Sequence, residues 1–313
     1  MIEAVEEARR ALAGIALRTP LVPLALGSET PGVYLKLENL QPTGAFKVRG
    51  AACAMAGLAP EQRARGVLTA SAGNMAQALA WTARRMGVPC TVVAPETAPD
   101  AKLDAVRRLG AEVIKVAFDR WWQTFVDHGY PGIDATFVHA FADERVMAGN
   151  GTIGLEILED RPDVDTILVP WGGGGLATGI AAAVRELKPS VRVLAVEVEG
   201  AAPLAASLRS GAVATIDYKP SFVDGIGSKT VMPEMLERAR DLLAGSLTVT
   251  VAEVASALRL LAERNRVVAE GAGAAPVAAA LSGRPGDGPV ACVVSGGNID
   301  LHKLAVILEG GLP

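Results

Sequence analysis

A single lysine stands at the centre of the segment Gln41-Pro42-Thr43-Gly44-Ala45-Phe46-Lys47-Val48-Arg49-Gly50. The segment follows a predicted strand over residues 33–38, turns at a proline and a glycine, and opens a helix of small residues over 48–57. The start of a helix is electropositive, so a lysine placed there is expected to have a lowered pKa. Because a neutral amine attacks carbonyl carbons, Lys47 is a candidate Schiff-base lysine. A solvated surface lysine at a junction between a strand and a helix would give the same local sequence. The other motifs of the chain must therefore decide between the two interpretations.

The composition is that of a folded protein with one large or two medium domains: 313 residues, 50% hydrophobic and 20% charged, with a net charge of -4. The sequence has no basic block, which argues against nucleic acid or an acidic membrane surface as a partner. It also has no apolar run long enough to span a bilayer and no signal peptide. Three widely spaced cysteines in apolar segments indicate buried thiols in a reducing compartment. We therefore expect a cytoplasmic protein.

From residue 67 onward, predicted strands and helices alternate. Strands are expected at 67–70, 90–94, 112–116, 166–170, 193–197 and 290–294, and helices at 74–86, 98–109, 144–158, 176–187, 251–266, 272–281 and 299–308. This rhythm predicts parallel sheets with helices on both faces. The aromatic stretch 118–132 is either a lid or a helix packed on a sheet, and packing is favoured. Because no low-complexity linker separates the parts, we expect two interleaved domains that share a cleft.

Four consecutive glycines follow one of these strands, in Pro170-Trp171-Gly172-Gly173-Gly174-Gly175-Leu176. Backbone N–H groups without side chains around them can close on an anion at a helix start, so the segment is a candidate phosphate-binding loop. The same unit also fits the dinucleotide pattern G-x-G-x-x-A, with Glu197 about 20 residues further on. The loop alone therefore leaves a dinucleotide and a single phosphate both open.

Two further loops have a related composition: Ser71-Ala72-Gly73-Asn74 and Ser295-Gly296-Gly297-Asn298. Each follows a predicted strand, at the edge where α/β proteins bind ligands, although each alone could be an ordinary helix cap. With Lys47 and the glycine loop, they supply an amine, a phosphate cradle, a carboxylate cradle and a hydroxyl. A pyridoxal phosphate site needs that set, whereas a dinucleotide site has no use for Lys47.

With these motifs the chain resembles the pyridoxal-phosphate enzymes of the tryptophan-synthase β fold (fold type II), in the threonine/serine dehydratase and serine racemase branch. The resemblance runs over almost the whole chain and includes the segments 43–50, 70–74, 95–102, 148–156, 172–175, 224–226, 270–274 and 295–298. It implies an α/β fold of two interleaved three-layer α/β/α domains with the active site between them. The large cofactor-binding domain would be 1–60 and 143–313, and the small mobile domain 61–142. A C-terminal regulatory domain is not expected, and a homodimer or homotetramer is.

The resemblance also implies roles for individual residues. Lys47 would hold the cofactor as a Schiff base and then act as the catalytic base, while Phe46 packs on the pyridine ring. Asn74 would bind the cofactor's 3′-oxygen, Ser295 would face the pyridine nitrogen, and the phosphate would lie on Gly172, Gly173, Gly174 and Gly175. The substrate carboxylate would be held by Ser71, Ala72, Gly73 and Asn74. The implied reaction is α,β-elimination of water from a β-hydroxy amino acid of the L-threonine/L-serine class, which gives a 2-oxo acid and ammonia.

Three positions depart from the pattern of that branch. In the serine racemases that this chain resembles, the position of Ala72 is a second serine, which acts as the base on the opposite face of the substrate. Alanine cannot move a proton, so the alternative activity, amino-acid racemisation, is disfavoured. Met75 stands where the branch usually has His, and with the aromatic stretch it favours a bulkier β-hydroxy amino acid as a second alternative. Some relatives bind a divalent cation through residues like Glu197 and the carbonyl of Ala201. Pro203 replaces the third ligand, so a cation site would need Glu199 as a substitute.

Overall fold

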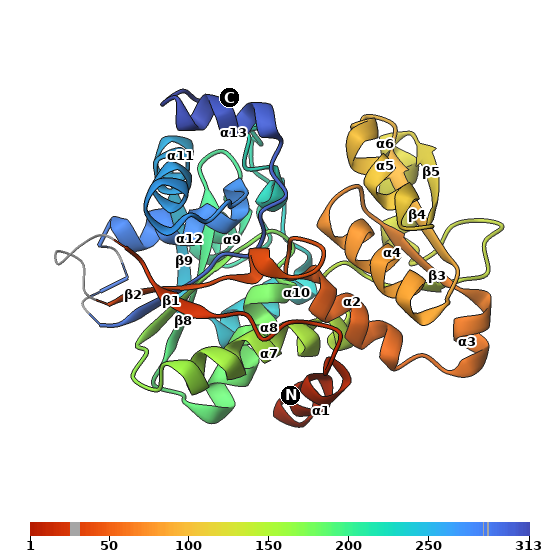
Figure 1. Ribbon diagram of the computed structural model, residues 1–313, viewed down its shortest axis with the longest axis horizontal. Coiled ribbons are helices and arrows are strands. Elements are labelled where there is room, and N and C mark those ends of the chain that lie inside the picture. Colours follow the sequence, from red (N-terminus) through yellow and green to blue (C-terminus); the bar gives the residue numbers. More distant parts are fainter. Residues whose placement is uncertain (26–31, 284, 287) are drawn as a thin grey trace.

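The computed structural model describes residues 1–25, 32–283, 285–286 and 288–313. Its strands form two separate sheets, one of six strands and one of four. Figure 1 shows the smaller sheet and its helices as a distinct unit, coloured orange to yellow, beside a larger body that contains both ends of the chain. The α/β class predicted from the sequence is confirmed.

The six-stranded sheet has the order β1 (Leu21–Pro23), β2 (Val33–Lys36), β10 (Val290–Val293), β7 (Thr166–Pro170), β8 (Arg192–Val198) and β9 (Gly245–Val249). All neighbours are parallel except β1 and β2, which pair antiparallel. The helices of this body are α1 (Ile2–Ala11), α2 (Lys47–Ala56), α7 (Glu144–Asp160), α8 (Gly175–Leu187), α9 (Pro203–Ser210), α10 (Pro233–Leu242), α11 (Val251–Leu260), α12 (Gly271–Leu281) and α13 (Leu301–Leu308). Short helical turns are η2 (Glu38–Leu40), η3 (Asp224–Ile226) and the π-helical η4 (Leu261–Asn265).

Strand β7 explains why this sheet is the middle of three layers. Ile167 and Val169 contribute to one buried cluster with α7, α8 and α10, whereas Leu168 contributes to the other with α11 and α12. Successive strand residues point to opposite faces, so a continuous run of apolar residues requires helices on both sides. The three-layer α/β/α arrangement follows from that run.

The four-stranded sheet is all parallel, with the order β5 (Glu112–Val116), β4 (Cys90–Pro95), β3 (Val67–Ala70) and β6 (Thr136–Phe137). Its helices are α3 (Pro60–Arg65), α4 (Asn74–Met86), α5 (Asp100–Arg108) and α6 (Phe118–Val126). Val67 and Val92 pack with α4 on one face, and Leu68 and Val93 pack with Trp121 of α6 on the other. The aromatic stretch therefore does pack on the sheet, as the sequence favoured.

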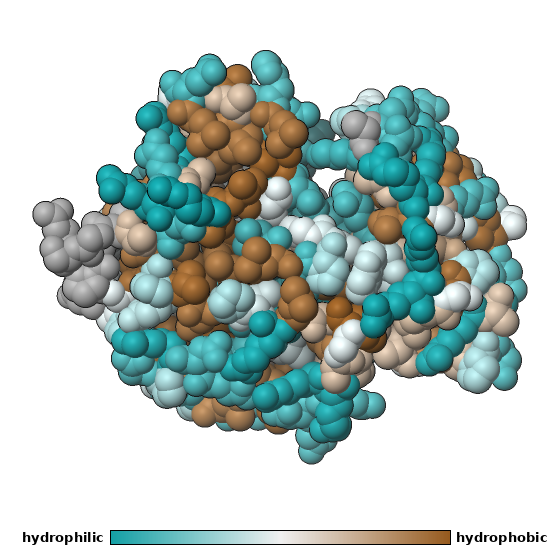
Figure 2. Space-filling view, in the orientation of Figure 1, coloured by the Kyte–Doolittle hydropathy of each residue, from teal (hydrophilic) through white to brown (hydrophobic). Residues whose placement is uncertain are grey.

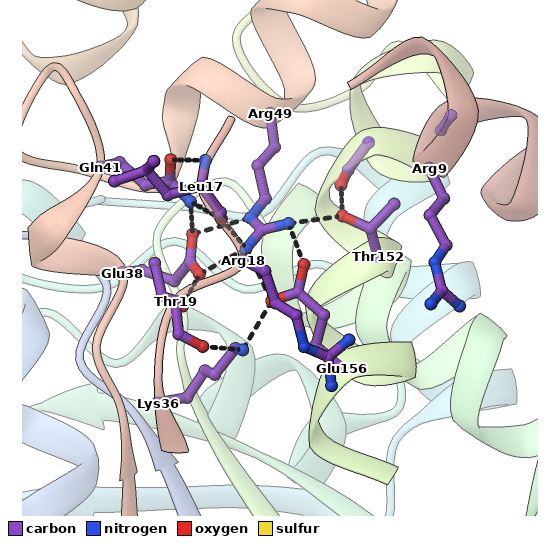
Figure 3. A network of polar contacts seen from close by, with 12 residues as sticks. Arg9, Leu17, Arg18, Thr19, Lys36, Glu38, Gln41, Arg49, Thr152 and Glu156 are labelled. Carbon is purple, nitrogen blue, oxygen red and sulfur yellow. Dashed lines mark hydrogen bonds and ion pairs between the residues drawn. The ribbon is translucent and has the colours of Figure 1, made fainter. Parts of the chain in front are cut away.

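A buried network of ion pairs fixes the start of α2, two residues beyond Lys47 (Figure 3). Arg49 is 2% exposed and donates to the carboxylates of Glu38 and Glu156 at 2.7–2.9 Å. Lys36 donates to Glu156 at 2.6 Å, so two cations face two carboxylates. Buried charges require such pairing, and the network ties β2, η2, α2 and α7 together behind the lysine.

Over the part of the chain that the structure describes, no helix is both long and apolar enough to cross a bilayer. Cys53, Cys90 and Cys292 are all free and buried, and burial raises the pKa of Cys53 and of Cys90 to about 12. At neutral pH these two thiols are therefore protonated and poorly nucleophilic, as expected for packing residues.

Candidate active site

A cavity of about 400 Å³ lies between the two units, and residues of both line it. In the orientation of Figure 2 the surface is hollowed between the larger body and the smaller unit. Clefts of this size that combine apolar walls with a few polar groups are where small molecules bind. The predicted site residues Phe46, Lys47, Ser71, Gly73, Asn74, Ser295 and all four glycines of 172–175 are among its walls.

The strand order explains why residues so far apart in sequence meet here. Strands β2, β10 and β7 are parallel neighbours, so the segments that follow them emerge at one edge of the sheet. Those segments are the lysine turn, the Ser295 loop and the glycine loop. The first two are joined directly, because the N–H of Phe46 donates to the carbonyl of Ser295 at 2.9 Å.

Lys47 is the first residue of α2 and reaches into the cavity. Its Nζ donates to the carbonyl of Ala140 at 2.6 Å and lies 5.1 Å from the centre of the Phe46 ring. Burial lowers the pKa of Lys47 to about 8, while the nearby Glu270 carboxylate opposes the shift. The direction predicted from the helix start is thus confirmed, but its main cause is desolvation. A lysine with this pKa is partly neutral near physiological pH and can act as nucleophile and base.

The glycine loop needs its glycines for space as well as for exposed N–H groups. A Cβ at Gly173 would come within 2.2 Å of the Phe141 ring, and one at Gly174 within 2.4 Å of the Trp171 ring. Gly174 also has φ of +93°, a conformation that side chains disfavour, and it caps the 13-residue helix α8. The first N–H groups of a helix lack partners within it and attract anions. The loop is therefore shaped as an anion cradle.

A polar chain formed by three side chains crosses the cavity wall, and the sequence did not predict it. Asn298 donates to Oδ1 of Asn74 at 2.8 Å, and Asn74 donates to Oε1 of Glu270 at 2.8 Å. Burial raises the pKa of Glu270 to about 7, and Asp224 adds to the shift. The segment 270–274 belongs to the family resemblance, but no role for Glu270 was predicted, because an acidic residue before a helix looks like an ordinary charge at a helix start.

The predicted carboxylate cradle lies at the start of α4. Ser71, Gly73 and Asn74 line the cavity, and the Ser71 hydroxyl accepts from the N–H of Gly73 at 3.3 Å. A Cβ at Gly73 would meet nothing within 4 Å, so the backbone there faces open space. Ala72 differs from these neighbours, because its methyl group packs against Ala94, Ala98 and Leu103.

Glu197 and Ala201 are buried in the larger body, away from the walls of this cavity. The two oxygens of Glu197 accept from the N–H groups of Leu204 and Ala205, both at 2.8 Å, and so cap α9. Glu199 accepts from the N–H of Val251 at 2.9 Å. Within the described ranges, no group of three or more His, Cys, Asp or Glu could hold a metal ion. Glu197 is fully buried and has no access to a nucleotide ribose, which removes one of the two features that indicated a dinucleotide.

Comparison with known proteins agrees with the chemistry of the residues that line the cavity. Residues 13–296 match the family model described as "Pyridoxal-phosphate dependent enzyme". The chain belongs to this family. Its cofactor is pyridoxal phosphate, and the residues of the cavity fit that group: an amine at Lys47, an anion cradle at the glycine loop, an amide at Asn74 and a hydroxyl at Ser295.

Relatives with assigned names cover nearly the whole chain. The L-threonine ammonia-lyase of Thermotoga maritima is 43% identical over 99% of this chain and 79% of its own length. The catabolic L-threonine dehydratase TdcB of Staphylococcus aureus strain N315 is 40% identical over 98% of this chain and 92% of its own length. Among solved structures, maize serine racemase superposes with a TM-score of 0.91 at 31% identity, over 99% of this chain and 97% of that one. The processed form of threonine deaminase isoform 2 from Solanum lycopersicum superposes with a TM-score of 0.89 at 30% identity, over 98% of this chain and 88% of that one.

Proposed function

We propose that this enzyme removes water from a β-hydroxy amino acid of the L-threonine/L-serine class by α,β-elimination, giving a 2-oxo acid and ammonia. It would then be a carbon–oxygen lyase of the ammonia-lyase type. The observation that carries the proposal is the position of Lys47: its low-pKa amine lies in one cavity with the glycine loop, Asn74 and Ser295. The threonine ammonia-lyase and threonine dehydratase relatives support the same reaction.

Lys47 has two tasks in this proposal. Its neutral amine would hold the cofactor by its aldehyde carbon, and the same Nζ would take the α-proton of the bound substrate. The carbonyl of Ala140 accepts a hydrogen bond from Nζ and would hold the amine at the cavity wall. Bound pyridoxal phosphate would accept the electron pair left when the proton is removed, which makes loss of the β-hydroxyl possible.

The other cavity residues position the cofactor and the substrate. Gly172 to Gly175 would bind the phosphate, Phe46 would pack on the pyridine ring, and Ser295 would face the ring nitrogen. Asn74 would bind the 3′-oxygen, because its amide is fixed by Asn298 on one side and Glu270 on the other. The N–H groups of residues 71–74, at the start of the 13-residue helix α4, would hold the substrate carboxylate.

Racemisation is the second candidate activity, because several similar structures are titled racemases, including those of serine and of aspartate. A racemase must return a proton to the opposite face of the α-carbon. Ala72 has no group that carries a proton, and its methyl packs against α5 and β4. We therefore place elimination before racemisation.

Four further expectations belong to this proposal. The small unit, residues 61–142, would move as one body to close the cavity over the substrate. The enzyme would be cytoplasmic, a location that its three free cysteines favour, and would work as a homodimer or homotetramer. A cation at Glu197 and Ala201 would require the carboxylate to release the N–H groups that it caps.

Absorption spectroscopy and product analysis test the function. With pyridoxal phosphate added, the protein should show a visible imine band, and Lys47→Ala should lose it. L-Threonine and L-serine should then yield 2-oxo acid and ammonia. A protein without the band would overturn the proposal, and D-serine in excess over pyruvate from L-serine would favour racemisation instead.

A further inference from the structure

The substrate side of the cavity has an apolar and aromatic wall that the proposed reaction itself does not require. Met75 at the start of α4 and Trp121, Trp122 and Phe125 of α6 all line the cavity. Ile226, Val231 and Met232 of the larger body line it as well. A side chain bound between Ser71 and these residues would therefore be surrounded mainly by carbon.

Packing of the small unit explains only part of this wall. Met75 and Phe125 are 2% and 5% exposed, and Trp121 packs with Leu68 and Val93 of the sheet, so all three contribute to the core. Trp122 is different: it remains 45% exposed, and its ring is stacked on Phe125 at 6.0 Å with an angle of 12° between the planes. A large apolar side chain held in a fixed orientation beside a cavity is a ready surface for a second aromatic ring.

The charges around the cavity exclude another class of substrate. Among the described residues that line it, the ionisable side chains are Lys47, Asp224 and Glu270. Lys47 is committed to the chemistry, and the other two are acids. Lys102 pairs with Asp224 at 2.9 Å, so a β-hydroxy amino acid with a carboxylate in its side chain would meet no unpaired cation other than Lys47 among the described lining residues.

We infer that the preferred substrate carries an aromatic or large apolar group on its β-carbon, which would lie against Trp122 and Met75. This inference rests on the proposed elimination. For β-phenylserine, the α-proton would pass to Lys47, the Cβ–O bond would break, and the hydroxyl would leave as water with the proton that Lys47 has taken up. The resulting enamine takes up water again and releases ammonia, so the product is phenylpyruvate.

Steady-state kinetics of the holoenzyme with threo-β-phenylserine, L-threonine and β-hydroxyaspartate test the inference. We expect kcat/KM for phenylserine to exceed that for threonine at least tenfold, and β-hydroxyaspartate to be the poorest substrate. An aromatic contact contributes about 0.5–1.5 kcal/mol beyond simple burial, so Trp122→Ala should lower kcat/KM for phenylserine by roughly tenfold. The same variant should change the value for threonine by less than about twofold, because a methyl group cannot stack on the indole.

Two variants act as controls. Phe118→Ala removes an aromatic ring from the same helix that is 58% exposed and does not line the cavity, so both substrates should be unaffected. Trp122→Leu keeps the apolar bulk and should lose less phenylserine activity than Trp122→Ala. Threonine preferred over phenylserine, or equal losses for both substrates in Trp122→Ala, would overturn this inference alone. A normal imine band without turnover of any of the three compounds would instead overturn the proposed function.

Discussion

At the scale of single residues, two of the ionisable side chains that line the cavity have pKa values displaced toward neutrality from opposite sides. Burial lowers the pKa of Lys47 to about 8 and raises that of Glu270 to about 7. Such pairs are typical of sites that move protons near neutral pH. Burial drives both shifts, because it disfavours whichever form is charged.

The amine of Lys47 should react with added pyridoxal phosphate in proportion to its neutral fraction. In the cofactor-free protein, we expect the rate of imine formation to rise about tenfold per pH unit below 8 and to level off above it. An ordinary lysine would continue to gain reactivity up to about pH 10.4. Stopped-flow absorption from pH 6 to 10 measures this profile. A rise that continues to pH 10 would contradict the lowered pKa.

Glu270 should control how firmly Asn74 is held. Its ionised form accepts a stronger hydrogen bond than its neutral form, so activity should rise with pH through about 7. Glu270→Gln keeps an acceptor but not the charge. At pH 8 it should lower kcat roughly fivefold and flatten the rise near pH 7, because hydrogen bonds to charged groups are worth about 1 kcal/mol more.

A stability measurement separates this role from a structural one. The pKa of Glu270 is higher in the folded protein than its ordinary value of 4.5, so the folded state binds the proton more tightly. The resulting stabilisation is complete below about pH 4.5 and is lost as the pH rises through 7. At pH 8, Glu270→Gln should therefore be at least as stable as the parent protein in thermal unfolding. Loss of both stability and activity would indicate a structural role only.

At the scale of helices and strands, the sequence predicted best where apolar runs are buried. Strands 67–70, 112–116 and 166–170 and helix 74–86 have the predicted bounds. Strand β9 and helix α10 were missed, because β9 is only half-buried and lacks a clear apolar pattern. The helix expected over 251–266 ends at Leu260 and continues as a π-helical turn, closed by Arg266 at φ of 59°. Packing rather than local sequence decides such endings.

The site residues divide in the same way. Lys47, Asn74, Ser295 and the glycine loop could be predicted because each follows a strand, at the edge where α/β proteins bind ligands. Glu270 could not, since its chemistry depends on burial and on its contact with Asn74, 196 positions away in the chain. The partners of Arg49 could not be predicted from the sequence either, because Glu38 and Glu156 lie on other elements.

The Arg49 network makes α2, and with it Lys47, depend on one buried cation. Arg49→Ala would leave the carboxylates of Glu38 and Glu156 without their main partner, and such losses cost about 3–5 kcal/mol. Urea unfolding should show a decrease of that size in the free energy of unfolding. Arg18→Ala is the matched control: it removes an arginine that also bridges two acids, but at 45% exposure, and should cost only about 0–1 kcal/mol. Equal effects would refute the structural assignment.

At the scale of the whole molecule, the cavity lies between two bodies. The chain passes from the larger body to the smaller one near residues 57–60 and returns near residues 138–143. The second crossing passes through the site itself, since Ala140 accepts from Lys47 and Phe141 packs on the glycine loop. His139 fixes this crossing, because its Nδ1 accepts from the N–H groups of Phe141 and Ala142. Motion of the small unit would therefore change the surroundings of Lys47 directly.

An ion pair between described residues joins the two bodies across the cleft: Lys102 of α5 contacts Asp224 of η3 at 2.9 Å. Asp224 also lines the cavity, so the pair would favour the arrangement in which the small unit approaches the substrate. Lys102→Ala should raise KM for the amino acid by up to about fivefold, the range of an exposed ion pair, and leave the imine band unchanged. The difference from the parent protein should shrink in about 1 M salt, because salt screens exposed charges.

Lys115→Ala is the matched control for Lys102→Ala. Lys115 pairs with Asp100 at 3.1 Å and is similarly exposed, but both residues belong to the small unit. Removing that pair should leave KM unchanged, because it does not connect the two bodies. If both variants raise KM equally, the effect comes from the charge of the small unit rather than from the contact across the cleft. If neither does, closure of the small unit does not depend on the Lys102–Asp224 pair.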